Sequence, residues 1–420
     1  MDELGSIAGR GTSLSPEWRA VLACSRAALP GANPARVYPD LSALDWLRLA
    51  EIAREHRVAP LVFPGLQGFA PPPASSGAVR ILKRLYLATA ARNTAFHAAL
   101  EKILGAMAAG GVRVIVLKGA GLAFTAYPER ALRPMNDIDL LIREEDLGKA
   151  EDQLAGVGYE AAHDARTKDD LRKRHHHWVF RSARPVLTGI PVELHWSLDP
   201  PGWPFRMDLE SLWEHAAPVR IADAVALMLG PEDSLLHLCT HAARHRFNGL
   251  MPLCDIAALS CFHDGSIDWP ALEDRAAPAQ ASPHAAIALQ LATDLLGAKV
   301  PAPTLHALRR ASPDGLPLEL ARERMLEEKG ATREAAELLL RWQRRGFRDR
   351  LATLKSALVP DTFSRPDSSG SGIVSRLSSY PAHIGSLLRR YLPMIGALAR
   401  HPTAVGGIAR REANKSPLDA

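Results

Sequence analysis

Residues 133–142 read Arg133-Pro134-Met135-Asn136-Asp137-Ile138-Asp139-Leu140-Leu141-Ile142, and this stretch decides the fold. Side chains alternate between the two faces of a β-strand, so Asp137 and Asp139 are predicted to share one face while Ile138, Leu140 and Ile142 enter a core. Two carboxylates on one face repel each other and gain nothing from burial. Mg²⁺ between their oxygens removes that repulsion, commonly with substrate phosphates as further ligands. The alternative is a solvated strand end with two surface acids.

The composition limits the class of protein. The chain has 420 residues, enough to bury a sizeable core in about two or three domains, and is 47% hydrophobic and 23% charged. Its net charge of +5 is spread along the chain, and its four cysteines lack a metal-binding spacing, which predicts free thiols in a reducing compartment. The acidic start Met1–Gly5 has no signal-peptide pattern and no apolar run reaches transmembrane length. We therefore expect a cytoplasmic protein.

Periodicity and turn residues divide the chain into four predicted parts. These are an N-terminal helical region (1–77), an α/β core (78–204), a helical domain (205–358), and a flexible linker with a basic amphipathic tail (359–420). The tail is expected to be a helix packed on the body; membrane-surface contact is an alternative that its prolines disfavour. Within the core we expect helices at 79–109 and 144–157, strands at 112–117, 137–142, 177–182 and 190–196, and a tight turn into a short helix at 118–127.

This order of elements resembles the DNA polymerase β nucleotidyltransferase superfamily: strand, glycine-containing turn, short helix, strand with Asp-x-Asp, helix, and a later strand with a third acid. More narrowly, the chain resembles the bacterial uncharacterised nucleotidyltransferases over about residues 17–345. The resemblance implies an α+β fold in which helices flank a small mixed β-sheet, with helical parts before and after it. The residues on which the resemblance depends are Val116-Leu117-Lys118-Gly119, Tyr127, Arg133, 136–141, 192–196, 238–241 and 253–256.

The resemblance also implies an activity. It predicts an enzyme that uses Mg²⁺, or Mn²⁺ as an alternative, to move an NMP from an NTP, by default ATP, to a hydroxyl or phosphate of a small molecule, peptide or protein. Members recur near peptide-modification and polysaccharide gene clusters. The alternatives are a kinase-like phosphoryl or pyrophosphoryl transferase, and a non-catalytic nucleotide-binding scaffold, against which the retained acids argue. A nucleic-acid partner is not expected, because aromatic residues are only 6% of the chain and no basic stripe carries them.

Three acids are the expected catalytic residues. Asp137, Asp139 and Glu193 are predicted to ligate the metal, and Glu193 to act as base on the incoming hydroxyl or as a ligand beside it. A lone strand glutamate is more often structural. Glu193, however, alternates with Val192 and Leu194 and can therefore share the face of the aspartates.

A second group is expected to contact the nucleotide. Lys118 is placed to offset triphosphate charge, the alternative being an exposed strand-end lysine, and Gly119 lets a phosphate approach the backbone at a helix start. Superfamily members usually have Gly or Ser after this glycine, but Ala120 stands here, so their phosphate contacts do not transfer directly. Arg133 either reaches the nucleotide phosphates or locks its loop onto the acid strand.

Histidines occur in three places. His237, His241 and His245 share one helix face, but no carboxylate or thiolate nearby completes a zinc site, so we expect helix packing with His241 near the nucleotide. The run 175–177 has the composition of a metal cluster or a tag, but it lies inside the chain after three basic residues and is predicted to lie in a basic loop beside the active site. His195 is predicted to support Glu193.

Overall fold

The computed structural model describes residues 14–31, 44–67, 75–162, 175–182, 190–203, 205–221 and 223–310, with positions 318, 321, 322, 325 and 326. The chain divides into two compact units, residues 1–312 and 313–420, and every helix and strand named below belongs to the first. The predicted linker and tail lie outside the described residues, and the four-part division stays a prediction. None of the described helices is long and apolar enough to cross a membrane.

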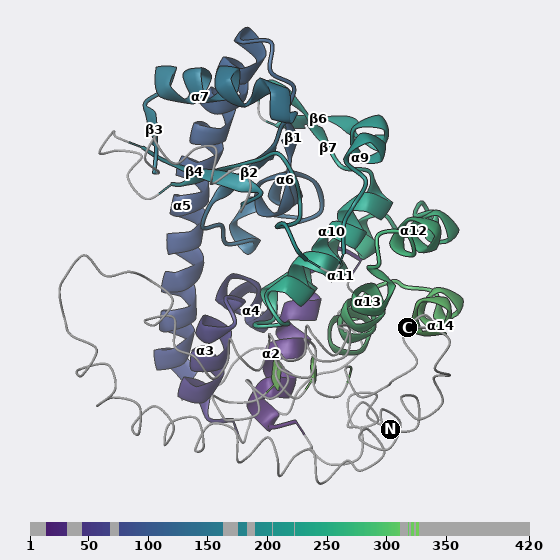
Figure 1. Cartoon of the computed structure of the whole chain (residues 1–420). Helices are drawn as coiled ribbons and strands as arrows, with labels where there is room; N and C mark the ends of the chain where they lie inside the picture. The colour runs from purple at the N-terminus through teal and green to yellow at the C-terminus, as the bar shows by residue number, and fades with distance from the viewer. Residues whose placement is uncertain are drawn as a thin grey trace, which may run out of the picture. The chain divides into compact units, whose positions relative to one another are not determined.

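One mixed sheet forms the centre of the first unit, with the strand order β3-β4-β5-β2-β1-β7-β6. β2 runs parallel to β5 and antiparallel to β1, and β1 runs parallel to β7. Together with the twelve α-helices among the described residues, this sheet confirms the predicted α+β class (Figure 1). The strands are β1 (Ile115–Val116), β2 (Ile138–Leu141), β3 (Tyr159–Ala161), β4 (His177–Ser182), β5 (Val192–His195), β6 (Ala217–Ile221) and β7 (Ala224–Met228).

Four helices precede the sheet in sequence. α2 (Pro16–Ala27) and α3 (Trp46–Glu55) start at side-chain caps, because Ser15 and Asp45 each accept a hydrogen bond from a backbone N–H of the first turn. α2 packs on α3 and on α4 (Ala59–Gln67), and α3 and α4 pack against α5 (Ser76–Ala109). α5 has 34 residues and runs from this helical group to the sheet (Figure 1). The prediction of a long helix there is confirmed, with a start three residues earlier than expected.

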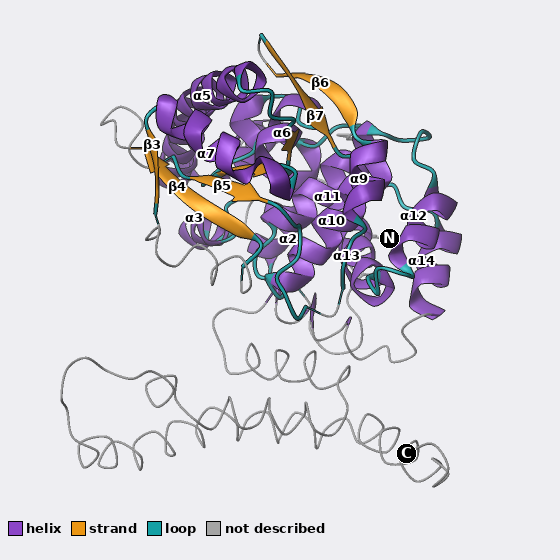
Figure 2. Ribbon diagram, turned by 45° about the horizontal axis from the view of Figure 1, so that its top comes forward, coloured by secondary structure: helices purple, strands orange, loops and turns teal. Residues whose placement is uncertain are grey.

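The two faces of the sheet differ in character. α5 and α7 (Leu147–Gly156) lie together on one side of the strands (Figure 2), where their apolar side chains form the main core with those of the sheet. Ile138, Leu140 and Ile142 belong to this core, as the alternation predicts. Residues between them in sequence, such as Leu141, instead join a smaller cluster with α9 (Leu209–His215). Asp139 is therefore directed away from the main core.

The sequence predicts helix almost throughout from residue 205, and this prediction is wrong at residues 217–228. There β6 and β7 form a hairpin that pairs with β1. β1 is buried and has only two residues, so its free edge needs a hydrogen-bonding partner, which β7 provides. Helices follow the hairpin: α10 (Pro231–Arg244), α11 (Met251–Phe262), α12 (Trp269–Ala276), α13 (Ser282–Leu296) and α14 (Ala302–Arg310).

Candidate active site

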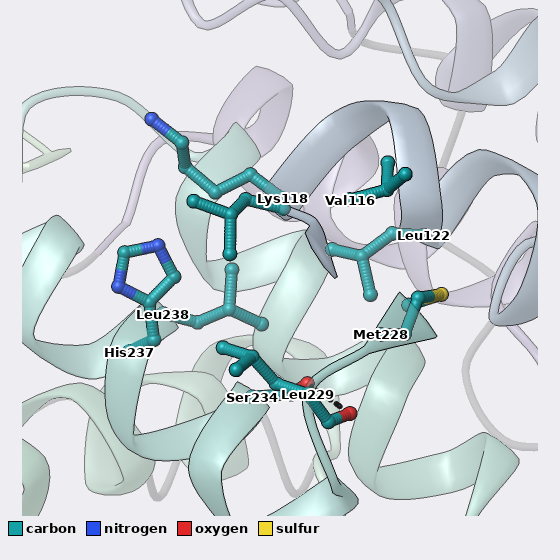
Figure 3. Close-up of a pocket in the computed structure, with 9 residues that line it drawn as sticks. Val116, Lys118, Leu122, Met228, Leu229, Ser234, His237 and Leu238 are labelled. Carbon is teal, nitrogen blue, oxygen red and sulfur yellow. Dashed lines mark hydrogen bonds between the residues drawn. The ribbon is translucent and has the colours of Figure 1, made fainter. Parts of the chain in front are cut away.

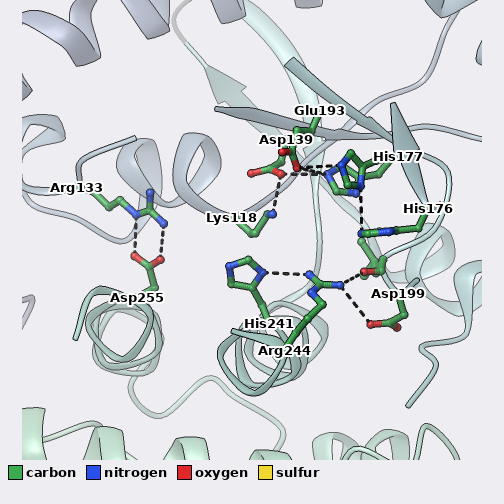
Figure 4. Close-up of polar contacts among 12 residues, drawn as sticks. Lys118, Arg133, Asp139, His176, His177, Glu193, Asp199, His241, Arg244 and Asp255 are labelled. Carbon is green, nitrogen blue, oxygen red and sulfur yellow. Dashed lines mark hydrogen bonds and ion pairs between the residues drawn. The ribbon is translucent and has the colours of Figure 1, made fainter. Parts of the chain in front are cut away.

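Asp139 and Glu193 lie side by side on neighbouring parallel strands (Figure 4). β2 and β5 pair in register, so that Asp139 is opposite Glu193 and Leu141 is opposite His195. β4 pairs antiparallel with β5 and places His177 opposite His195. Because residues opposite one another in a sheet point to the same face, the register brings two acids and two histidines together.

Asp139 is buried and paired with two basic side chains. Lys118 Nζ lies 2.7 Å, and His195 Nε2 lies 3.0 Å, from the Oδ1 atom of Asp139. Burial opposes ionisation of this carboxyl, but the charge of Lys118 and the hydrogen bond with His195 hold its pKa well below the usual range. Asp139 is therefore a carboxylate at neutral pH. Lys118 is nearly buried beside this carboxylate, with only 10% of its side chain exposed.

Glu193 is more accessible than Asp139, with 25% of its side chain exposed. Its Oε2 atom lies 3.5 Å from His195 Nε2 and 3.9 Å from His177 Nε2. Burial raises the pKa of Glu193, but the hydrogen bond with His195 and the electrostatic effects of His195 and His177 together leave the pKa below its ordinary value. The result is an ionised carboxylate that can accept a proton or ligate a cation. The contact also agrees with the predicted pairing of His195 with Glu193.

Asp137 stands apart from this pair. It precedes β2 and is half-buried. Burial and the neighbouring carboxylate of Asp139 raise its pKa to about 6, although Lys118 acts in the opposite direction. Asp137 therefore carries an unfavourable charge at neutral pH in the absence of a cation.

A divalent cation fits the acid pair together with His195. Among the described residues, Asp139, Glu193 and His195 each offer a ligand atom within 4.8 Å of the others, whereas Asp137 is outside this group. His195 Nε2 lies 3.0 Å from Asp139 Oδ1 and 3.5 Å from Glu193 Oε2. Adjacent ligand atoms in an octahedral site are about 3 Å apart when each is bonded at about 2.1 Å, so these distances are close to those of metal ligands. The carboxylates suit Mg²⁺ or Mn²⁺, whereas an imidazole nitrogen is a poorer ligand for these oxygen-preferring ions.

Lys118 and Gly119 begin the helix α6 (Lys118–Thr125) rather than a separate tight turn. Lys118 has a φ of 45°, in the left-handed region, which costs a residue other than glycine about 1–3 kcal/mol. A Cβ atom on Gly119 would collide with the guanidinium of Arg133. Glycine at position 119 therefore leaves room for the guanidinium of Arg133. The predicted contact of Gly119 with a phosphate stays a prediction.

Arg133 ties the loop before β2 to the helix α11. Its Nη2 atom lies 2.6 Å from Asp255 Oδ2, its Nε atom donates to Asp255 Oδ1 at 3.0 Å, and its Nη1 atom donates to the carbonyl of Pro134. The hydroxyl of Tyr127 donates to the same carboxylate at 2.7 Å. Arg133 therefore locks its loop, but onto α11 and not onto the acid strand as expected, and contact with nucleotide phosphates stays a prediction. Asn93 on α5 reinforces the loop by donating to its backbone carbonyls.

The three histidines of α10 lie along one helix face, with ring centroids 6.2 Å and 4.5 Å apart in succession. Arg244 Nη2 lies 3.1 Å from His241 Nδ1, and Arg244 Nη1 donates to the carbonyl of Leu198. Burial, followed by the charge of Lys118, holds the pKa of His241 well below its usual range. His241 is therefore neutral, and its predicted contact with the nucleotide stays a prediction.

A small pocket lies beside Lys118, between α6, β7 and α10 (Figure 3). Its wall is mostly aliphatic, and Lys118, Ser234 and His237 are its polar residues. Both ring nitrogens of His237 are buried without a hydrogen-bond partner among the described residues. Burial holds the pKa of His237 well below its usual range, so that the ring is neutral.

The sequence matches the family model described as an uncharacterised nucleotidyltransferase over residues 42–297, more than half of the chain. The chain belongs to this family. It is therefore a nucleotidyltransferase by family, and membership identifies it as an enzyme that acts on an NTP. Nucleotidyltransferases typically use divalent metals, which agrees with the acid and histidine cluster described above.

No curated protein matches the nucleotidyltransferase chain in sequence. Similar solved structures include the antibiotic-resistance factor ANT(2'')-Ia, at 15% identity and a TM-score of 0.28, covering 53% of this chain and 91% of that one. Another is an antigenic nucleotidyltransferase-like protein from Paracoccidioides brasiliensis, at 14% identity and a TM-score of 0.31, covering 50% and 96%. TM-scores this low support no inference about function, so the assignment depends on the family match.

Sequence reasoning about the nucleotidyltransferase missed two features of the site. Asp255 received no role, although a lone acid in the otherwise apolar helix α11 signals a buried basic partner. The grouping of His176 and His177 with His195 was also missed. The alternation of Glu193 and His195 on one strand face, beside a histidine run on a candidate strand, was the available signal.

Proposed function

We propose that this enzyme is a cytoplasmic nucleotidyltransferase that uses Mg²⁺, or Mn²⁺, to move an NMP, by default AMP, from an NTP to a hydroxyl or phosphate group. The acceptor is a small molecule, a peptide or a protein. The observation that carries the proposal is the register of β2 and β5, which sets two ionised carboxylates side by side at the surface of the sheet. Two ionised carboxylates side by side repel each other even with Lys118 beside one of them, and a divalent cation between them would remove that repulsion, so this arrangement is typical of a metal-dependent site.

The proposed roles follow from exposure and pairing. Asp139 and Glu193 would hold the metal, with Asp137 close enough for its charge to reinforce the site, while His195 keeps its hydrogen bond from Nε2 to Asp139. The metal would supply positive charge that offsets the charge on the phosphates. Glu193, the more exposed acid, would accept the proton of an attacking hydroxyl group. Lys118, now paired with Asp139, would contact the triphosphate as a compact point charge when the metal takes its place on that carboxylate.

Calorimetric titration with a non-hydrolysable ATP analogue tests the proposal. We expect binding in Mg²⁺ to be at least about tenfold tighter than in EDTA, because metal and triphosphate complete each other's coordination. Glu193→Gln should lose most of this difference. Glu160→Gln, an exposed acid on β3 of the same sheet, should retain it and serves as the control. Identical affinity in Mg²⁺ and EDTA for the wild type would contradict the proposal.

A further inference from the structure

Three histidines form a second cluster on the edge of the acid pair. His177 and His195 are opposite each other on β4 and β5, and His176 precedes His177 at the start of β4. Each offers a ring nitrogen within 4.8 Å of the others. His195 is buried, with 2% of its surface exposed, and His176 is nearly so, with 9%. The preceding His175 is exposed and outside the cluster.

The spacing of the ring nitrogens is that of metal ligands. His176 Nε2 and His177 Nδ1 lie 3.3 Å apart in a hydrogen bond, which a shared metal ion would replace. Two imidazole nitrogens bonded to one tetrahedral Zn²⁺ at about 2.0–2.1 Å are separated by about 3.3 Å. The ring of His195 has its centroid 4.9 Å from that of His177 and 5.4 Å from that of His176.

A second observation, independent of this spacing, comes from His195. Its Nε2 atom faces Asp139, but its Nδ1 atom is buried with no hydrogen-bond partner among the described residues. Leaving a buried polar atom without a partner costs about 1–3 kcal/mol. Coordination of a metal by this nitrogen would remove the cost.

We propose that His176, His177 and His195 bind a transition-metal ion of the Zn²⁺ class, distinct from the metal of the acid pair. Imidazole nitrogens suit Zn²⁺, Co²⁺ or Ni²⁺, whereas Mg²⁺ prefers oxygen ligands, and His195 would bind this ion through Nδ1 while its Nε2 atom keeps the hydrogen bond to Asp139. Glu193 lies 3.9 Å from His177 Nε2 and adds a favourable charge, while Lys118 and Arg244 act electrostatically on His176 and weaken the affinity. A metal here would fix the ring of His195 and so its contacts with both acids.

The test uses the full-length protein, stripped of metal with EDTA and then held in excess Mg²⁺ to occupy oxygen-rich sites. Zn²⁺ is titrated by calorimetry, and Co²⁺ by its visible absorption spectrum. The wild type and the control His175→Ala should bind one Zn²⁺ with the same affinity at this site. His176→Ala and His177→Gln should bind it about 10- to 100-fold more weakly, and their Co²⁺ spectra should lose the intense bands of tetrahedral coordination.

The comparison with His175→Ala separates this cluster from other zinc-binding groups such as free cysteines. If His176→Ala does not fold by circular dichroism, His177→Gln decides, because His177 is only half-buried. The proposal is overturned if the wild type binds no Zn²⁺ in excess Mg²⁺, or if the two cluster variants bind it as the control does. Metal affinity is the readout, so the result is independent of whether nucleotidyl transfer is the correct function.

Discussion

Replacing Asp137 by asparagine should stabilise the metal-free protein. Burial and Asp139 raise the pKa of Asp137 from 3.8 to about 6. At about 1.36 kcal/mol for each pH unit, this difference corresponds to about 3 kcal/mol of unfavourable free energy when Asp137 is ionised. Partial exposure of the side chain to water reduces the expected gain to about 1–2 kcal/mol.

The gain should depend on pH in a defined direction. Because the folded-state pKa is raised, the penalty is absent below about pH 3.8, where Asp137 is protonated in both states, and complete above about pH 6. The stabilisation by Asp137→Asn should therefore be full at pH 7.5 and about a third as large at pH 4.5. Urea unfolding in EDTA at both pH values measures it, with the exposed Asp152→Asn on α7 as the control.

Asp139→Asn should have the opposite effect. Asp139 is ionised and buried against Lys118 and His195, so removing its charge leaves Lys118 without its partner. Removing one member of a buried ion pair costs about 3–5 kcal/mol of the free energy of unfolding. Because asparagine can still form hydrogen bonds, the expected loss for Asp139→Asn is near the lower value. If both variants are stabilised equally, or if Asp137→Asn gives the same change at both pH values, the assignment of charges at this site is refuted.

Three further outcomes are expected. Mg²⁺ and ATP together should raise the melting temperature more than either alone, and Lys118→Ala should reduce this shift in thermal-shift assays without abolishing it. Arg133→Ala should lower the free energy of unfolding in urea by about 3–5 kcal/mol, because Asp255 is left buried without its partner. If the double variant Arg133→Ala, Asp255→Ala loses as much stability as the two single variants added together, this pairing is contradicted. Gly119→Ala should lower the free energy of unfolding by about 1–3 kcal/mol, because the added methyl group collides with the guanidinium of Arg133. In the Arg133→Ala background the same substitution should cost little, and equal losses in both backgrounds would argue against the collision.

Local pattern was enough to predict much of the core. Ile138 and Leu140 lie in the main core and Asp139 points away from it. Strand alternation involves only a few consecutive residues, so this arrangement could be predicted from the sequence. The strand at 177–182 and the long helix α5 were predictable for the same reason. The predicted proximity of Asp139 and Glu193 came from the order of elements in a resembling family, because periodicity alone does not define which strands pair.

Contacts between distant segments were not predictable from pattern. Arg133 and Asp255 are 122 positions apart, and nothing local in either segment identifies the other. The β6–β7 hairpin was missed because its short alternating runs lie in a region of strong helical periodicity, and only the free edge of β1 requires it. Lys118 was open to interpretation as an exposed strand-end residue until its 2.7 Å contact with Asp139 was seen.

Transfer of the α-phosphate tests the central claim most directly. The enzyme is incubated with Mg²⁺ and ATP labelled on either the α- or the γ-phosphate, together with small-molecule and protein fractions of a bacterial extract as acceptors. Nucleotidyl transfer predicts that the α label enters a product, that pyrophosphate is released, that the γ label never enters the product, and that Glu193→Gln abolishes the reaction. A product carrying the γ label, with ADP released, would contradict the account and identify a kinase on this fold.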